Sequence, residues 1–172
     1  EHISQTKYDG LYLLSPSPQD LMEEYFDFDL DRISEVVEIL KRLFDIVLID
    51  IPYNPPLEFC VGALTHSHIG SFTATERVDA LSNITRLLDY VGSLGISAGK
   101  FTNIIFTNLQ DLHYDFGMLK KLKFNMVANL PLVKAAQADA LEGRIYVRDN
   151  PLVNGLYKKE LEKIIHMMLM QA

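Results

Sequence analysis

The sequence contains a single cysteine, Cys60, among its 172 residues. An intrachain disulfide is therefore excluded, and a metal site built from cysteine thiolates is disfavoured because such sites use several of them. Apolar runs are short: Ile46–Ile49 has the length of a strand, whereas a membrane-spanning helix needs about 20 such residues. The first residues also lack the basic and apolar pattern of a signal peptide. We expect a cytoplasmic protein without a membrane span.

Basic residues are also outnumbered by acidic ones. The chain carries 16 lysines and arginines against 23 aspartates and glutamates, which gives a net charge of −7. Sequence-independent DNA binding over a broad surface depends on neutralising phosphates with Lys and Arg, so this mode is disfavoured. Two lysine groups remain, and we interpret both as solvated helix faces rather than basic patches. They are Lys120, Lys121 and Lys123, and Lys158, Lys159 and Lys163.

A phosphate-binding loop is the third absence. No segment matches GxxxxGK[ST], and no glycine-rich loop precedes Leu11. Such a loop needs clustered glycines so that backbone N–H groups can surround the phosphates. The chain also begins Glu1-His2-Ile3 without a methionine, which suggests a fragment or a processed product. We expect that these residues alone do not hydrolyse ATP.

What is present is an alternation of apolar strand-length runs with helical patterns. The expected strands are Leu11–Leu14, Asp45–Asp50, Ile69–Thr75, Phe101–Asn108 and Asn125–Leu130. The expected helices are Asp20–Phe26, a segment from Asp29 or Asp31 to Leu43, Leu57–Leu64, Glu76–Leu94, Tyr114–Leu122, Lys134–Leu141 and Pro151–Met170. This order predicts one α/β domain over residues 1–172, with a doubly wound, mostly parallel sheet and helices on both faces.

The segment Phe44–Pro52, FDIVLIDIP, is the most informative of these runs. Four consecutive apolar residues between two acids are typical of a strand buried on both faces of a parallel sheet. Ligands bind at the carboxyl ends of such strands, where Asp50 would lie. A carboxylate there suits Mg²⁺, bound through water, and it equally suits the cap of a following turn or helix.

The order of the segments resembles a known family. FDIVLIDIP resembles the strand and switch region of the ParA/MinD-type P-loop ATPases, and FTNIIFTNL resembles their strand that ends in a base-reading asparagine. NMVANLPLVKAAQADALEGRIYV and PLVNGLYKKELEKII resemble their late strand, loop and closing helix, and GLYLLSPSP resembles an earlier strand. The family's first strand, phosphate loop and first switch have no counterpart here, so the resemblance implies a C-terminal portion that lacks a central strand.

The resemblance implies ATP or ADP and Mg²⁺ as cofactors, held together with a phosphate loop from outside these residues. Asp50 would orient Mg²⁺ and the attacking water, and Pro52 would lie in the switch region beside the nucleotide. Asn108 would read the adenine base through its amide, and Pro131 and Leu132 would line the base. From the residues alone, Asn108 fits a turn cap equally well, and Pro131 fits a strand stop.

The family resemblance also suggests a role and partners. It implies a homodimer that positions cargo such as a pilus or secretion apparatus or DNA, most similar to the CpaE/TadZ-like pilus branch. Protein partners of a localisation or secretion machine would recruit it to the cell pole or membrane surface. The alternative is a catalytically inactive scaffold that keeps the fold. His66 and His68, two apart on a strand, form a weak metal-pair candidate because a third ligand is missing nearby.

Overall fold

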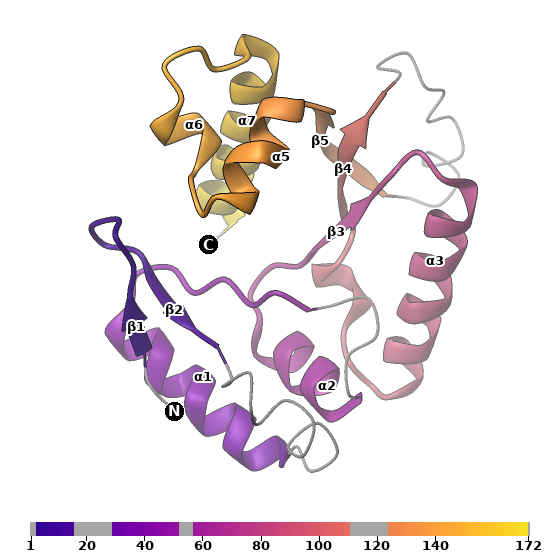
Figure 1. Cartoon of the computed structure of the whole chain (residues 1–172). Coiled ribbons are helices and arrows are strands. Elements are labelled where there is room, and N and C mark those ends of the chain that lie inside the picture. Colours follow the sequence, from indigo (N-terminus) through magenta and orange to yellow (C-terminus); the bar gives the residue numbers. More distant parts are fainter. Residues whose placement is uncertain (1–2, 16–28, 52–56, 111–123, 172) are drawn as a thin grey trace. The chain divides into compact units, whose positions relative to one another are not determined.

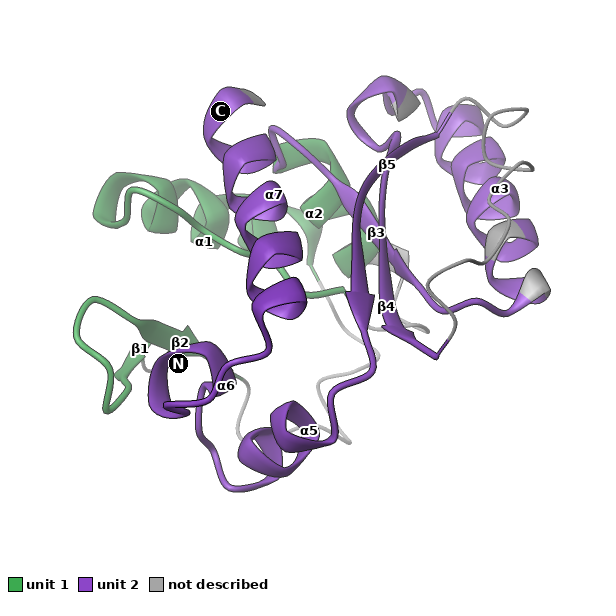
Figure 2. Ribbon diagram, turned by 90° about the horizontal axis from the view of Figure 1, so that it is seen from above, with its two compact units in different colours: residues 1–66 green, residues 67–172 purple. Residues whose placement is uncertain are grey.

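The computed structural model describes residues 3–15, 29–51, 57–110 and 124–171 (Figure 1). By its internal contacts the chain divides into two compact units, residues 1–66 and 67–172 (Figure 2). The placement of one unit relative to the other is not determined, and each is therefore described by itself. The predicted helices Asp20–Phe26 and Tyr114–Leu122 and the lysines between residues 120 and 123 lie outside the described residues.

The second unit is built on a three-stranded parallel sheet. Its strands are β3 (Ser71–Ala74), β4 (Asn103–Leu109) and β5 (Asn125–Pro131), in the order β3-β4-β5. The three corresponding strand predictions are confirmed, with boundaries that agree to within about two residues. Consecutive residues Ile104, Ile105 and Phe106 of the middle strand are all buried, as is typical of a parallel strand covered on both faces.

Helices cover both faces of this sheet, as Figure 2 shows. On one face α3 (Val78–Ser93) packs its Ile84 into a cluster with Ile104 and Phe106. On the other face α7 (Gly155–Gln171) contacts Ile105 and Leu130 through partly buried apolar side chains. The predicted fold class, a doubly wound α/β arrangement with a parallel sheet, is confirmed.

The helix ends follow local backbone chemistry. α3 is followed by Gly95, whose φ of 80° lies in the left-handed region that glycine adopts without steric cost. Likewise α5 (Lys134–Leu141) is followed by Gly143 at a φ of 65°. The structure corrects the start of the last helix, which begins at Gly155 and not near Pro151.

The shift of that helix start has a visible cause. A short helix, α6 (Tyr146–Asp149), precedes the loop, and its Tyr146 hydroxyl accepts a hydrogen bond from the backbone N–H of Asn154 at 2.7 Å. The Asn150 side-chain oxygen also accepts from the N–H of Leu152 at 2.9 Å. These side-chain bonds compete with helical pairing and keep the intervening residues out of the helix.

In the first unit two helices pack together. α1 (Leu30–Leu43) begins where predicted, because the Asp29 side chain caps it by accepting the N–H of Asp31 at 2.9 Å. The buried Ile33 of α1 lies against α2 (Leu57–His66), where a Cβ added to Gly62 would come within 2.7 Å of Ile33 Cγ2. Glycine at position 62 thus permits close approach of the two helices.

The predicted strand Leu11–Leu14 is present as β2 (Tyr12–Leu14), with a different pairing from the one expected. It pairs antiparallel with β1 (Ile3–Gln5) in a separate two-stranded sheet. The connection is short and turns at Gly10, whose φ is 74°. A connection of this length joins antiparallel neighbours, whereas parallel strands need a long crossover.

The prediction of a buried strand over Asp45–Asp50 is wrong for this structure. Residues 46–50 have no strand assignment, and the side chains of Ile46 and Leu48 are 58% and 77% exposed. A strand is held by hydrogen bonds to a neighbouring strand. Within the described residues, β1 and β2 pair with each other, and β3 pairs only with β4. Residues 46–50 therefore have the apolar composition of a strand but no neighbouring strand to pair with in that part of the chain.

Burial of Cys60 leads to a first prediction. The thiol of α2 is buried, and burial raises its pKa, so the reactive thiolate is scarce. We expect an aromatic disulfide reagent to modify the native chain at least about tenfold more slowly than the chain in concentrated guanidinium, because reaction requires local opening. Absorbance of the released thiol measures both rates. Equal rates would contradict burial of the Cys60 thiol.

Candidate functional site

Asn108, Pro131 and Leu132, which come from different segments of the sequence, meet at the carboxyl edge of the sheet in the second unit. Leu109 of β4 is the register partner of Pro131 of β5. The N–H of Leu132 donates to the carbonyl of Leu109 at 2.9 Å. Asn108 precedes Leu109 directly, so the three residues predicted to line a base are brought together. This is the edge at which ligands bind in open parallel sheets.

Asn108 has an unusual backbone. Its φ is 56°, and among the described residues it is the one non-glycine with a positive φ. The β4–β5 register is irregular between Phe106 and Leu109, where this conformation occurs. Asparagine tolerates the left-handed region better than most residues, and strained conformations gather at functional sites. The Asn108 side chain is exposed, so its amide is available both as a donor and as an acceptor.

Glu76 adds a carboxylate at the same edge. Ala74 of β3 is the register partner of Phe106, and Glu76 and Asn108 each lie two residues beyond those paired positions. One oxygen of Glu76, Oε2, is buried and has no hydrogen-bond partner in the described part of the chain. A buried carboxylate oxygen left unpaired is costly, and an external donor or a hydrated cation would satisfy it. The sequence predicts Glu76 as the first residue of a helix, Glu76–Leu94, and gives it no role at the site.

The start of α3 supplies further charge beside Glu76. Arg77 donates from Nε and Nη2 to the two carboxylate oxygens of Asp79, at 3.1 and 2.8 Å. These hydrogen bonds lower the pKa of Asp79. Asp79 lies in the first turn of the helix, where a negative charge also interacts favourably with the helix dipole. Arg77 is thus held next to the edge.

An ion pair between the buried Asp139 and the exposed Arg144 holds the segment that follows Pro131 and Leu132. Asp139 of α5 accepts hydrogen bonds from Arg144 Nε and Nη2 at 2.9 and 2.6 Å, and Arg144 also pairs with Glu142. The pKa of Arg144 is raised, chiefly by its hydrogen bonds to Asp139. Asn150 Nδ2 lies 3.4 Å from the second Asp139 oxygen. The network ties α5 to the turn before α6 and supports the loop at the sheet edge.

The two remaining predicted site residues belong to the first unit. Asp50 is exposed and follows the unpaired apolar segment, and no position relative to Asn108 is determined for it. Pro52 lies outside the described residues. The structure therefore brings together Asn108, Pro131 and Leu132, and it leaves the predicted Mg²⁺-side residues Asp50 and Pro52 unplaced with respect to them.

The histidine pair is not arranged as predicted. His66 ends α2 instead of lying on a strand, and its Nε2 lies 2.8 Å from the Ser34 hydroxyl of α1. Its Nδ1 is 3.7 Å from Glu38, so the ring joins the two helices. Across the described ranges, no three His, Cys, Asp or Glu side chains gather as a metal-binding group. Among the helices that these ranges contain, none has the length and apolar character required to span a bilayer.

Comparison with known proteins supports the fold. No protein-family model matches the sequence, and no curated protein matches it either. Among solved structures, the cell division ATPase MinD of Pyrococcus furiosus is similar over 96% of this chain and 69% of that chain, with a TM-score of 0.72 and 19% identity. The chain therefore has a MinD-like, P-loop NTPase type of fold, and at this identity the likeness concerns the fold alone.

Proposed function

We propose that this chain is the base-binding part of a ParA/MinD-like ATPase that positions cellular cargo such as a pilus or secretion apparatus or DNA. The observation that carries the proposal is the position of Asn108. Asn108 is exposed, has a left-handed backbone, and directly precedes Leu109, the residue that pairs with Pro131 and accepts the N–H of Leu132 at the carboxyl edge of a MinD-like sheet. An amide can pair with both a donor and an acceptor on a purine edge. Pro131 and Leu132 offer apolar surface to the face of the purine ring.

In this proposal the remaining parts of the site have defined tasks. The phosphate-binding group comes from outside these 172 residues, because no GxxxxGK[ST] segment occurs in them. Asp50 would hold the water shell of Mg²⁺, and Pro52 follows it closely in the sequence. Glu76, with its unpaired buried oxygen, accepts a hydrogen bond from the ligand or its waters. The assembled protein is a cytoplasmic homodimer that localisation or secretion partners recruit.

A second candidate is a scaffold that keeps the fold without hydrolysing ATP. The observation that favours it is the exposed segment at Ile46 and Leu48, which leaves Asp50 outside any sheet in the described first unit. A site in which the Mg²⁺-side carboxylate is not fixed lacks the preorganised electrostatics that phosphoryl transfer requires. The two candidates differ in nucleotide binding, which decides between them.

Asn108 variants provide the test. In the protein as the cell makes it, with Mg²⁺ present, we expect Asn108→Asp to weaken binding of a fluorescent ATP analogue by about tenfold, because a carboxylate cannot donate to the base. Asn108→Gly should weaken it comparably while tolerating the left-handed backbone. Equilibrium fluorescence titration gives the dissociation constants, and thermal unfolding shows whether the fold is kept.

Glu162→Ala is the matched control, because Glu162 is exposed on α7 and lines a groove next to the first residues of β5. It should leave the affinity unchanged. Saturable binding that is indifferent to both Asn108 variants would remove the base-reading role. Absence of nucleotide binding in the whole protein would favour the scaffold.

A further inference from the structure

The outer edge of β5 is unevenly protected. In the described residues β5 ends the sheet, so its outer side has no strand neighbour. Such an edge offers backbone N–H and C=O groups that can pair with another chain. At Asn129 the outward N–H is already used, because the Glu160 carboxylate of α7 accepts it at 2.8 Å. The preceding residues, Asn125–Val127, have no comparable cap from α7 among the described contacts. Of the three, Asn125 already donates its N–H inward, to the carbonyl of Thr102 at 2.7 Å, so Met126 is the residue whose backbone groups face outward.

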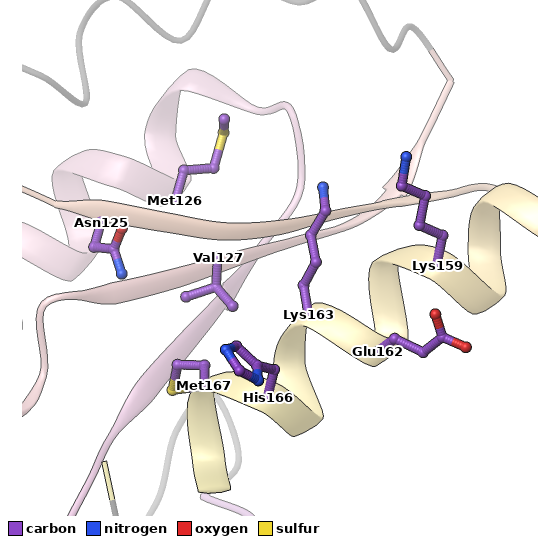
Figure 3. A pocket seen from close by; sticks show the side chains of 8 residues that line it. All are labelled: Asn125, Met126, Val127, Lys159, Glu162, Lys163, His166 and Met167. Carbon is purple, nitrogen blue, oxygen red and sulfur yellow. The ribbon is translucent and has the colours of Figure 1, made fainter. Parts of the chain in front are cut away.

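A groove of about 460 Å³ runs between these three residues and α7 (Figure 3). Val127 and Met167 contribute apolar surface to it, on the side of the strand that faces the helix. The side chain of Met126 points to the opposite side of the strand and is also exposed. An extended segment laid along Asn125–Val127 would therefore place alternate side chains over Met126 and over the α7 groove.

The helix side of the groove carries two lysines and one glutamate, Glu162, although the chain as a whole is acidic. Lys159 and Lys163 are one helical turn apart, and Figure 3 shows both ammonium groups projecting to the same side, with Glu162 pointing away from them. Lys163 forms an ion pair with Glu160, to which its Nζ donates a hydrogen bond at 2.6 Å. Lys159 has no ion pair in the described part of the chain, and the exposed His166 lines the groove nearby. Lys159 is thus the uncompensated cation of the groove.

We propose that this groove binds an extended, acidic segment of a partner protein, which adds as a strand to β5 at Asn125–Val127. Carboxylates on the side facing α7 pair with Lys159 and Lys163, and the intervening apolar side chains cover Met126. Main-chain hydrogen bonds supply affinity in this mode of binding, while the alternate side chains supply specificity. The segment stops at Asn129, where Glu160 occupies the next outward donor.

A second copy of this chain is a poorer occupant of the same edge. The β5 sequence, NMVANLP, contains no carboxylate to meet the lysines. Pairing β5 with β5 of another copy would also bring two sets of Lys159 and Lys163 close to one another, and like charges at short range are repulsive. The groove lies next to the first residues of β5, whereas Pro131 ends that strand, so binding here does not depend on the nucleotide role proposed above.

The test uses a fluorescein-labelled peptide of alternating aspartate and valine, titrated into the whole protein and followed by fluorescence anisotropy. We expect saturable binding that Lys159→Glu weakens by about tenfold or more. Lys158→Glu makes the same change of charge at the neighbouring exposed residue, which does not line the groove, and should have little effect. A peptide of alternating lysine and valine should not bind.

Hydrogen exchange separates strand addition from simple charge attraction. Bound peptide should slow exchange of the Met126 backbone amide, and the amide of Asn129, already bound to Glu160, should not change. The proposal is overturned if no peptide binds, if Lys158→Glu and Lys159→Glu weaken binding equally, or if binding occurs without protection of β5. Binding of phosphatidylserine vesicles in place of the peptide would also overturn it and assign the lysines to an anionic membrane.

Discussion

Replacing Gly70 by alanine is expected to destabilise the second unit by about 2–3 kcal/mol. A Cβ at this position would lie 1.7 Å from Cδ1 and 2.1 Å from Cε1 of the Phe101 ring. The ring is only 3% exposed, so it has little free space into which to turn. The backbone is held as well, because the Gly70 N–H donates to the carbonyl of Lys100 at 2.9 Å. Relief of the clash must therefore displace the start of β3 or the core beneath it.

Urea unfolding followed by circular dichroism measures this loss. Gly92→Ala is the matched control, because Gly92 lies within α3 and a Cβ there meets nothing within 4 Å. That substitution should leave stability unchanged or raise it slightly, as alanine favours helix more than glycine does. Adding Phe101→Leu to Gly70→Ala should restore part of the loss by making room. Equal unfolding midpoints for the two single variants would show that the Phe101 ring does not pack over Gly70.

Replacing Glu160 by alanine is expected to cost about 2 kcal/mol. The Glu160 side chain is 7% exposed, and its two oxygens have separate tasks. Oε2 accepts the backbone N–H of Asn129 at 2.8 Å, and Oε1 accepts from Lys163 Nζ at 2.6 Å. Alanine would leave the N–H of an edge strand unpaired under a helix and would remove the partner of an ammonium group. The packing of α7 against β5 would be weakened at Asn129.

Two variants separate these contributions in the same unfolding assay. Glu160→Gln keeps an acceptor for Asn129 and loses the charge, so its loss should be smaller than that of Glu160→Ala. Glu162→Ala removes an exposed carboxylate two residues along the helix and should change stability by less than about 0.5 kcal/mol. If Glu160→Ala were as mild as Glu162→Ala, the buried hydrogen bond to β5 would contribute nothing measurable.

The parallel sheet of the second unit could be predicted because its signals are local. Ile104, Ile105 and Phe106 form an unbroken apolar run, and Gly95 and Gly143 mark helix ends through a backbone conformation that other residues avoid. The meeting of Asn108 with Pro131 then follows from strand direction, since the carboxyl ends of parallel neighbours share one edge. These inferences need no knowledge of distant contacts.

Other features depend on such contacts and had no local signal. The burial of an unpaired Glu76 oxygen is a consequence of the folded surroundings, which residue type and spacing do not report. The loop before α7 is non-helical because the hydroxyl of Tyr146 reaches Asn154, and the two are eight residues apart. A tyrosine eight residues before an asparagine does not, by itself, predict a hydrogen bond between them.

The segment Asp45–Asp50 was mispredicted for a related reason. An apolar composition indicates that a segment is suited to a sheet, whereas strand conformation also requires a neighbour with free backbone groups. In the described parts of the first unit, β1 and β2 pair with each other, and no hydrogen-bonded ladder joins residues 46–50 to either strand. The local pattern and the available partners therefore disagree at this point.

The exposure of Ile46 and Leu48 has a consequence for self-association. A short apolar segment without proline, free of its own sheet, is the type of sequence that stacks into intermolecular cross-β aggregates. Here Asp45 and Asp50 bracket the segment, and both are exposed. In a stack of identical segments their carboxylates would be brought into register with their own copies, which charge repulsion opposes. The two aspartates are thus placed as gatekeepers against aggregation, a physical task for Asp50 that requires no nucleotide.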